Sequence, residues 1–320
     1  MKNVNSIDLN FQGVTIGISG QDFLTSTTLA NLESNITGLR VGKSFETIAR
    51  GQIDFTPAAT VSAKLIGEQA LSITGQPHLF AGGIAIAHTA QYMSECIRPS
   101  VKDLFLVHAA AVVDPQDNSA IVLFGEKGAG KTTLAFRLCH EHGYVLVGND
   151  QIFLGHDNER LYVEGGNNYF DIRTTAVRSD SYLGSVVLAR SNNKPAWNDK
   201  LRVRAHDLGI ASSTEYHTAK QLLHVRIDHT ENSLKVAPWS GLQQTLVMHE
   251  RIGRHISGQA TPLLDDNGTY YGSLPSMLNQ HGLAARDRIV SHIQTIGITE
   301  IFAPNAQAAL EFITTEGKQQ

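Results

Sequence analysis

Eight consecutive residues fit the phosphate-loop pattern G-x-x-x-x-G-K-[ST] at every position: Gly125, Glu126, Lys127, Gly128, Ala129, Gly130, Lys131 and Thr132. Glycines at this spacing let the backbone curl so that its N–H groups point inward, where they cradle phosphate oxygens. Lys131 is then expected to reach the β- and γ-phosphates, and Thr132 to offer its hydroxyl to Mg²⁺. With Thr133 as the next contact, the sequence predicts a site for ATP and Mg²⁺.

The flanking residues predict the elements that this loop needs. Residues 120–124 form an apolar run suited to a buried strand, and residues 132–142 have the pattern of a helix that ends at Gly143. A strand before the loop and a helix after it are the arrangement that the motif requires. The helix would also direct the partial positive charge of its N-terminus at the bound phosphates.

The rest of the pattern predicts an α/β protein with a division near residue 100. We expect a smaller α+β region over residues 1–100 and the nucleotide-binding domain over residues 101–320. Apolar runs predict strands at 11–18, 81–86, 104–113, 144–147, 184–189 and 298–303, and a hairpin from 222–229 and 233–237. Helices are expected at 87–96, 242–256, 276–295 and 306–314.

Composition excludes several classes of protein. The 320 residues are 42% hydrophobic, which is enough for a sizeable core, and the net charge of −4 makes no electrostatic case for a nucleic-acid or membrane partner. With only Cys96 and Cys139, a disulfide framework or a zinc site is not expected. Neither a secretory signal nor a membrane-spanning run is visible, so a cytoplasmic protein is predicted.

The residues around the loop follow an order that resembles a known kinase family. His108 lies in the apolar run before the loop, and the segment after the helix is Gly143-Tyr144-Val145-Leu146-Val147-Gly148-Asn149-Asp150. Over about residues 105–155 this order resembles the HPr kinase/phosphorylase family and its HPr-kinase-related relatives. These are P-loop kinases similar in fold to phosphoenolpyruvate carboxykinase, which implies the same core here. Weaker similarity extends to about residue 175.

The resemblance implies roles for individual residues. Asp150 matches the second member of the family's acidic pair, the base toward the acceptor hydroxyl, and Asn149 replaces the first member. His108 matches a histidine expected near the phosphates or the base. Asp171 and Arg173 match the family's Glu-Ile-Arg-Gly sequence, with aspartate for glutamate and threonine for glycine. Asp171 is thereby a candidate Mg²⁺ ligand with Thr132, and Arg173 a candidate for stabilising the transferred phosphoryl group.

Two questions about these side chains stay open at the level of the residues. A carboxylate beside the loop, such as Asp150, could hold Mg²⁺ or accept the hydroxyl proton. Other arginines could also supply positive charge to the phosphoryl group: Arg178, Arg202, Arg204, Arg251, Arg254, Arg286 and Arg288.

A phosphate loop alone indicates only a nucleoside triphosphate. The favoured function is an ATP-dependent kinase acting on a hydroxyl of a small molecule or peptide, because residues 1–100 do not resemble the regulatory domain of true HPr kinases. The alternatives are a protein serine kinase with an HPr-like carrier substrate and an ATPase or nucleotide-dependent switch. Residues 193–196 lack the final aspartate of the guanine-reading motif Asn-Lys-x-Asp. Assembly into a homo-oligomer is expected by analogy with the family.

Overall fold

The computed structural model describes residues 6–20, 22–24, 28, 39–42, 46–157, 160–178, 180–191, 194–196, 199–254, 261–277 and 279–316. The chain divides into two compact units, one of Met1–Phe105 with His249–Arg288 and one of Leu106–Met248 with Ile289–Gln320. The expected division at residue 100 is therefore corrected, because residues 249–288 join the first unit. The physical reason is that Leu263, Leu274 and Met277 are buried in the hydrophobic core of that unit.

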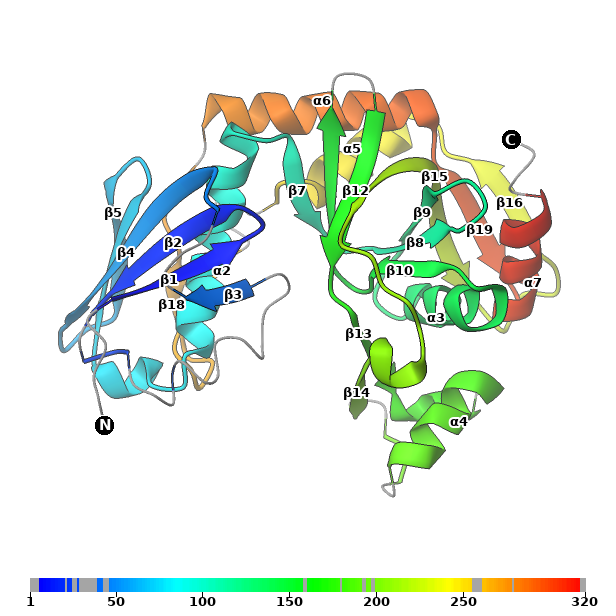
Figure 1. The fold of residues 1–320 in the computed structure, drawn as a ribbon, viewed down its shortest axis with the longest axis horizontal. Helices are drawn as coiled ribbons and strands as arrows, with labels where there is room; N and C mark the ends of the chain where they lie inside the picture. The colour runs from blue at the N-terminus through cyan, green and yellow to red at the C-terminus, as the bar shows by residue number, and fades with distance from the viewer. Residues whose placement is uncertain are drawn as a thin grey trace. The chain divides into compact units, whose positions relative to one another are not determined.

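In the first unit a mixed sheet carries one long helix, coloured blue to cyan in Figure 1. Its strands follow the order β3 (Leu39–Gly42), β1 (Ser6–Phe11), β2 (Val14–Ser19), β4 (Ala49–Pro57), β6 (Ala70–Gly75) and β5 (Ser62–Gly67). Helix α2 (Ile84–Ile97) packs on β1, β2 and β4. A hairpin of β17 (Pro262–Leu264) and β18 (Tyr270–Ser273) completes the unit.

Two expected strands of the first unit differ from the structure. Residues 11–18 are interrupted by a turn at Gln12 and Gly13, which both have positive φ, so the run forms the end of β1 and most of β2. Residues 81–86 form no strand, and α2 begins at Ile84. Short apolar runs fit either a strand or a buried helix, so their periodicity alone does not decide between the two.

A buried ion pair lies at the end of α2. Arg98 donates to the Glu95 carboxylate and, at 3.0 Å, to the Phe11 carbonyl, and the Arg98 and Glu95 side chains are 0% and 5% exposed. We expect Arg98→Ala to lower the free energy of unfolding by about 3–5 kcal/mol, because the buried Glu95 carboxylate would lose the opposite charge of the guanidinium. Urea denaturation measures the loss. The control is Arg50→Ala, whose 58% exposed side chain pairs with Asp8 and should contribute less than about 1 kcal/mol. Equal losses in the two variants would contradict this account.

The second unit is built on a nine-stranded sheet. Its main path follows the order β10 (Val145–Gly148), β8 (Ala110–Asp114), β9 (Ser119–Phe124), β15 (Tyr216–Ile227), β12 (Arg160–Gly166), β11 (Ile152–Asp157) and β7 (Leu104–Val107). β19 (Thr299–Ala303) also pairs with β15, and β16 (Lys235–Pro238) pairs with β19. β15 runs parallel to both β9 and β19, whereas β8 is antiparallel to β9 and to β10.

Helices cover this sheet and lead to a smaller hairpin. α3 (Lys131–His142) and α7 (Ala306–Glu311) pack against each other (Figure 1), and Leu134 of α3 and Leu310 of α7 share a core with Leu123 of the sheet. β13 (Tyr169–Arg173) and β14 (Lys200–Arg204) form a two-stranded sheet, and η3 (Thr174–Arg178) and α4 (Ser181–Arg190) lie between them in sequence. The division between the units falls within α5 (Gly241–Arg251) and α6 (Gln280–Ile296). Among the helices described, none is long and apolar enough to cross a membrane.

Two further expectations are corrected in the second unit. Residues 184–189 are helical and belong to α4, because the Asp180 carboxylate caps the helix by accepting the N–H groups of Tyr182 and Leu183. The expected hairpin of 222–229 and 233–237 does not form, since β16 pairs with β19 instead of β15. The reason is that β19 already occupies that edge of β15, and the Asp228 N–H donates to the Ala303 carbonyl of β19 at 2.9 Å.

Candidate active site

Several strand ends of the second unit meet at one edge of its sheet. β9, β15 and β19 run parallel, and β10 runs in the same direction because both β9 and β10 are antiparallel to β8. The segments that follow these strands therefore emerge at the same edge, and β8 begins there. In open α/β sheets, ligands bind in the crevice outside the carboxyl ends of the strands.

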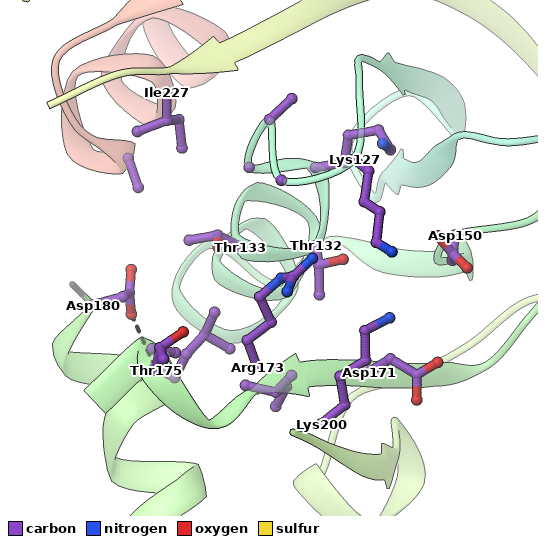
Figure 2. Close-up of a pocket in the computed structure, with 18 of the residues that line it drawn as sticks. Lys127, Thr132, Thr133, Asp150, Asp171, Arg173, Thr175, Asp180, Lys200 and Ile227 are labelled. Carbon is purple, nitrogen blue, oxygen red and sulfur yellow. Dashed lines mark hydrogen bonds between the residues drawn. The ribbon is translucent and has the colours of Figure 1, made fainter. Parts of the chain in front are cut away.

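A pocket of about 360 Å³ lies at this edge. It is lined by most of the residues that the sequence singled out: His108, Lys127, Gly128, Ala129, Gly130, Lys131, Thr132, Thr133, Asp150, Asp171 and Arg173. Gly125 and Glu126 are not among the lining residues, because they form the beginning of the loop beside β9. Of the eight arginines considered, Arg173 is the one that lines the pocket, and Figure 2 shows its guanidinium extending toward Thr132.

The loop has the curled backbone that the glycine spacing predicts. Gly125, Gly128 and Gly130 have φ values of 148°, 91° and 101°. A Cβ on Gly125 would lie 2.6 Å from the Val225 carbonyl oxygen of β15, and helix α3 begins directly after Gly130. Lys131 is only 6% exposed, and its Nζ donates to the carbonyls of Gly125 and Glu126 at 2.8 and 3.1 Å. These two hydrogen bonds therefore hold the Lys131 ammonium beside the first two residues of the loop.

The loop geometry predicts that Gly125→Ala destabilises the protein by about 2–3 kcal/mol, because both the positive φ and the contact with a backbone oxygen oppose a side chain. We also expect it to weaken binding of the Mg·ATP that the sequence predicts for this loop. Gly143→Ala is the matched control. Gly143 also has a positive φ, of 70°, but no atom lies within 4 Å of its added Cβ, so about 1 kcal/mol is expected. Urea denaturation and calorimetry compare the variants. Similar losses of stability and affinity in both would contradict the role of the close contact.

Asp150 occupies a strained turn between β10 and β11. It has a φ of 70°, which is uncommon for a residue other than glycine and typical of functional sites. The turn is shaped by Gly148, whose added Cβ would lie 2.8 Å from the Gly166 Cα. Asn149 is 1% exposed and holds the turn, because its Nδ2 donates to the Tyr169 carbonyl at 3.1 Å. The first position of the expected acidic pair thus has a packing role.

His108 lies beside Asp150. Its Nδ1 is 3.3 Å from Asp150 Oδ1, and both side chains are 45% exposed. The sequence placed His108 within one strand over 104–113, but that run is divided into β7 and β8 by a bend at His108 and Ala109. The bend is what brings the imidazole to the start of β8, at the same edge as the loop.

Asp171 and Arg173 lie on β13 and face the pocket. The Asp171 carboxylate accepts two hydrogen bonds from Arg202, at 2.8 and 3.0 Å, and this bonding raises the pKa of the Arg202 guanidinium. An ionised carboxylate has about four acceptor positions, so Asp171 retains capacity for a metal ion. Arg202, which the sequence offered as a phosphate ligand, instead pairs with Asp171.

The oxygen donors of the pocket fit Mg²⁺. Thr132, Asp150 and Asp171 supply a hydroxyl and two carboxylates, the hard ligands that this ion prefers. Within the described ranges no group of three or more His, Cys, Asp or Glu side chains gathers. Mg²⁺ bound with a nucleotide usually needs only one or two carboxylates, the remaining ligands being phosphate oxygens and water.

Sequence reasoning missed several residues of the pocket: Thr175, Asp180, Lys200, Ile227, His229 and Ala306. Ile227 ends β15, His229 follows it, and Ala306 follows β19, so they reach the site because β15 pairs with the loop strand β9 and β19 pairs with β15. Lys200 reaches it because β14 pairs with β13, directly opposite Arg173. None of these residues lies in a motif, and strand pairing is what brings Lys200, Ile227, His229 and Ala306 to the pocket.

No known family model matches the sequence, and none of the curated proteins matches it. Among solved structures, this chain is similar to the Hpr(Ser) kinase/phosphatase from Coxiella burnetii. The match has 16% sequence identity and a TM-score of 0.25, and covers 41% of this chain and 76% of that chain. At this TM-score the likeness is distant, and it assigns neither a substrate nor a mechanism.

Proposed function

We propose that this protein is an ATP-dependent kinase that transfers the γ-phosphate to a hydroxyl of a small molecule or peptide. One observation carries the proposal. A single pocket contains a glycine-rich loop with a held lysine, a hydroxyl at the start of a helix, and a carboxylate paired with a histidine. An ATPase or switch uses the same loop, but the exposed Asp150–His108 pair supplies a group that can take a proton from an acceptor.

The nucleotide would be held by the loop and the start of α3. The positive φ values at Gly128 and Gly130 curl the backbone, so that its N–H groups and the N-terminus of α3 can bind phosphate oxygens. Lys131 would neutralise the β- and γ-phosphates, and Arg173, which extends toward Thr132 in Figure 2, would stabilise the transferred group. Thr133 lines the pocket one residue further along the helix.

Asp150 would act as the base in the transfer step. Its carboxylate accepts the proton of the acceptor hydroxyl, the acceptor oxygen forms a bond to the γ-phosphorus, and the bond from that phosphorus to the β–γ bridging oxygen breaks to release ADP. His108 would orient the Asp150 carboxylate through the contact at 3.3 Å. Thr132 and Asp171, or Asp150, would hold Mg²⁺, which offsets the negative charge of the β- and γ-phosphates.

The test is binding followed by transfer. Calorimetry should detect uptake of ATP by the folded protein in the presence of Mg²⁺, and labelled ATP should give a phosphorylated alcohol or peptide. Label appearing on a protein band of a cell lysate would instead favour the protein serine kinase. ATP hydrolysis at a rate that no acceptor changes would favour the ATPase or switch. Folded protein that takes up no nucleotide would refute all three functions.

A further inference from the structure

The charges that line the pocket are not balanced on its β13–β14 side. Asp171 pairs with Arg202 and Asp180 caps α4, and among the described residues neither carboxylate forms an ion pair with Lys200. Lys200 is exposed and lines the pocket, and within the described part of the chain its ammonium has neither a hydrogen bond nor an ion pair. The pocket therefore presents a cation that the protein itself does not neutralise.

The register of the two strands adds to this imbalance. Lys200 and Arg173 are directly opposite each other on β14 and β13, and both line the pocket. Like charges at directly opposed positions destabilise a sheet. An anion bound between or beside them would remove that repulsion. Lys200 thus gives this hairpin a positive charge that no described carboxylate neutralises through an ion pair.

The phosphates of a bound nucleotide explain the position of Arg173 but not that of Lys200. Lys131, the N-terminus of α3 and Arg173 already face the position of the phosphates. In Figure 2 the Lys200 side chain rises past Asp171 on the Asp150 side of Arg173. Hydrogen bonding to Asp171 is the main cause of the raised pKa of Arg202 on β14, and the Asp150 carboxylate adds a small coulombic contribution. Lys200 is therefore placed on the side where the acceptor hydroxyl must meet its base.

We propose that Lys200 is a specificity-determining residue that selects acceptor alcohols carrying a second, anionic group. The ammonium binds a carboxylate or phosphate of the acceptor, and this contact presents the acceptor hydroxyl to Asp150. The inference rests on the proposed kinase function and names the substrate class of that same site. A charge-assisted hydrogen bond of this kind is among the stronger polar contacts in proteins.

The experiment compares glycerol, glycerate and glycerol phosphate as acceptors at saturating Mg·ATP, with ADP release and product mass as readouts. We expect at least one anionic alcohol to exceed glycerol in kcat/KM by about 100-fold, and the two anionic arms distinguish a carboxylate from a phosphate. Lys200→Met should lower kcat/KM for that acceptor by about 10- to 100-fold, the range for a hydrogen bond to a charged group. The same variant should leave kcat/KM for glycerol and the Kd for Mg·ATP unchanged.

Two further variants serve as controls. Lys200→Arg should retain the preference for the anionic alcohol, and Lys64→Met, which removes an exposed lysine of β5 in the other unit, should change nothing. The proposal would be overturned if Lys200→Met lost kcat/KM equally with glycerol, or if its affinity for Mg·ATP fell. It would also be overturned if protein that binds Mg·ATP transferred phosphate to neither anionic alcohol. Wild-type protein that binds no Mg·ATP would instead refute the kinase function itself.

Discussion

Replacing Asp150 by asparagine is expected to lower kcat for phosphate transfer by about 100- to 10,000-fold, the range that a positioned general base contributes. Asparagine cannot take the acceptor proton at neutral pH. It does tolerate the left-handed backbone that Asp150 adopts at a φ of 70°, where alanine would add strain. The variant therefore removes the proton acceptor without disturbing the turn between β10 and β11.

The same variant separates the two roles that the carboxylate could have. If Asp150 is the base, the Kd for ATP measured by calorimetry with Mg²⁺ should stay close to that of the wild type. If Asp150 mainly holds the metal, Mg²⁺-dependent ATP affinity should fall together with kcat, and Asp171→Asn should then have the smaller effect of the two. Turnover by Asp150→Asn equal to that of the wild type would remove Asp150 from the mechanism.

Lys131→Met is expected to lower kcat by about 100- to 1,000-fold, as removal of one donor to a developing charge commonly does. It should also weaken Mg·ATP binding by about 10- to 100-fold, because a charge-assisted contact to the phosphates is lost. The ammonium is already held at the mouth of the loop by the carbonyls of Gly125 and Glu126. Methionine keeps the length of the side chain but donates no hydrogen bond.

Lys127→Met provides the comparison within the same loop. Lys127 also lines the pocket, but its side chain is exposed, whereas Lys131 is 6% exposed. We expect the loss of ATP affinity in Lys127→Met to be less than about tenfold, the size of a solvent-screened charge contact. Unfolding midpoints confirm that both variants remain folded. Equal effects at the two positions would show that general positive charge, and not the placement of Lys131, supports binding.

The part of this site that can be predicted from the sequence is the part whose atoms lie close together along the chain. The loop from Gly125 to Thr132 supplies its curl, its lysine and its hydroxyl within one strand–loop–helix unit. Local backbone chemistry is sufficient to specify such a unit, because glycine at positive φ and a helix N-terminus act over a few residues. His108, Asp150, Asp171 and Arg173 entered through a family resemblance, and the structure places all four around the same pocket.

The assignment of short apolar runs shows where local pattern fails. Residues 184–189 fit a strand by their β-branched residues, yet they form α4, which the Asp180 side chain caps. The pairing of β16 likewise depends on β19, which lies more than sixty residues further along the chain and occupies the edge of β15 in the structure. Each outcome was decided by a partner outside the window that sequence periodicity can examine.

By itself, then, the sequence determined a curled glycine-rich loop with its lysine and hydroxyl, and the strand and helix that flank it. Only the tertiary structure decided which other side chains share that site. Lys200, His229 and Ala306 are brought to the loop by strand pairing, β14 with β13 and β15 with β9 and β19. The physical reason is that hydrogen bonds between strands join segments far apart in the chain, and the direction of each strand determines which of its ends reaches the pocket.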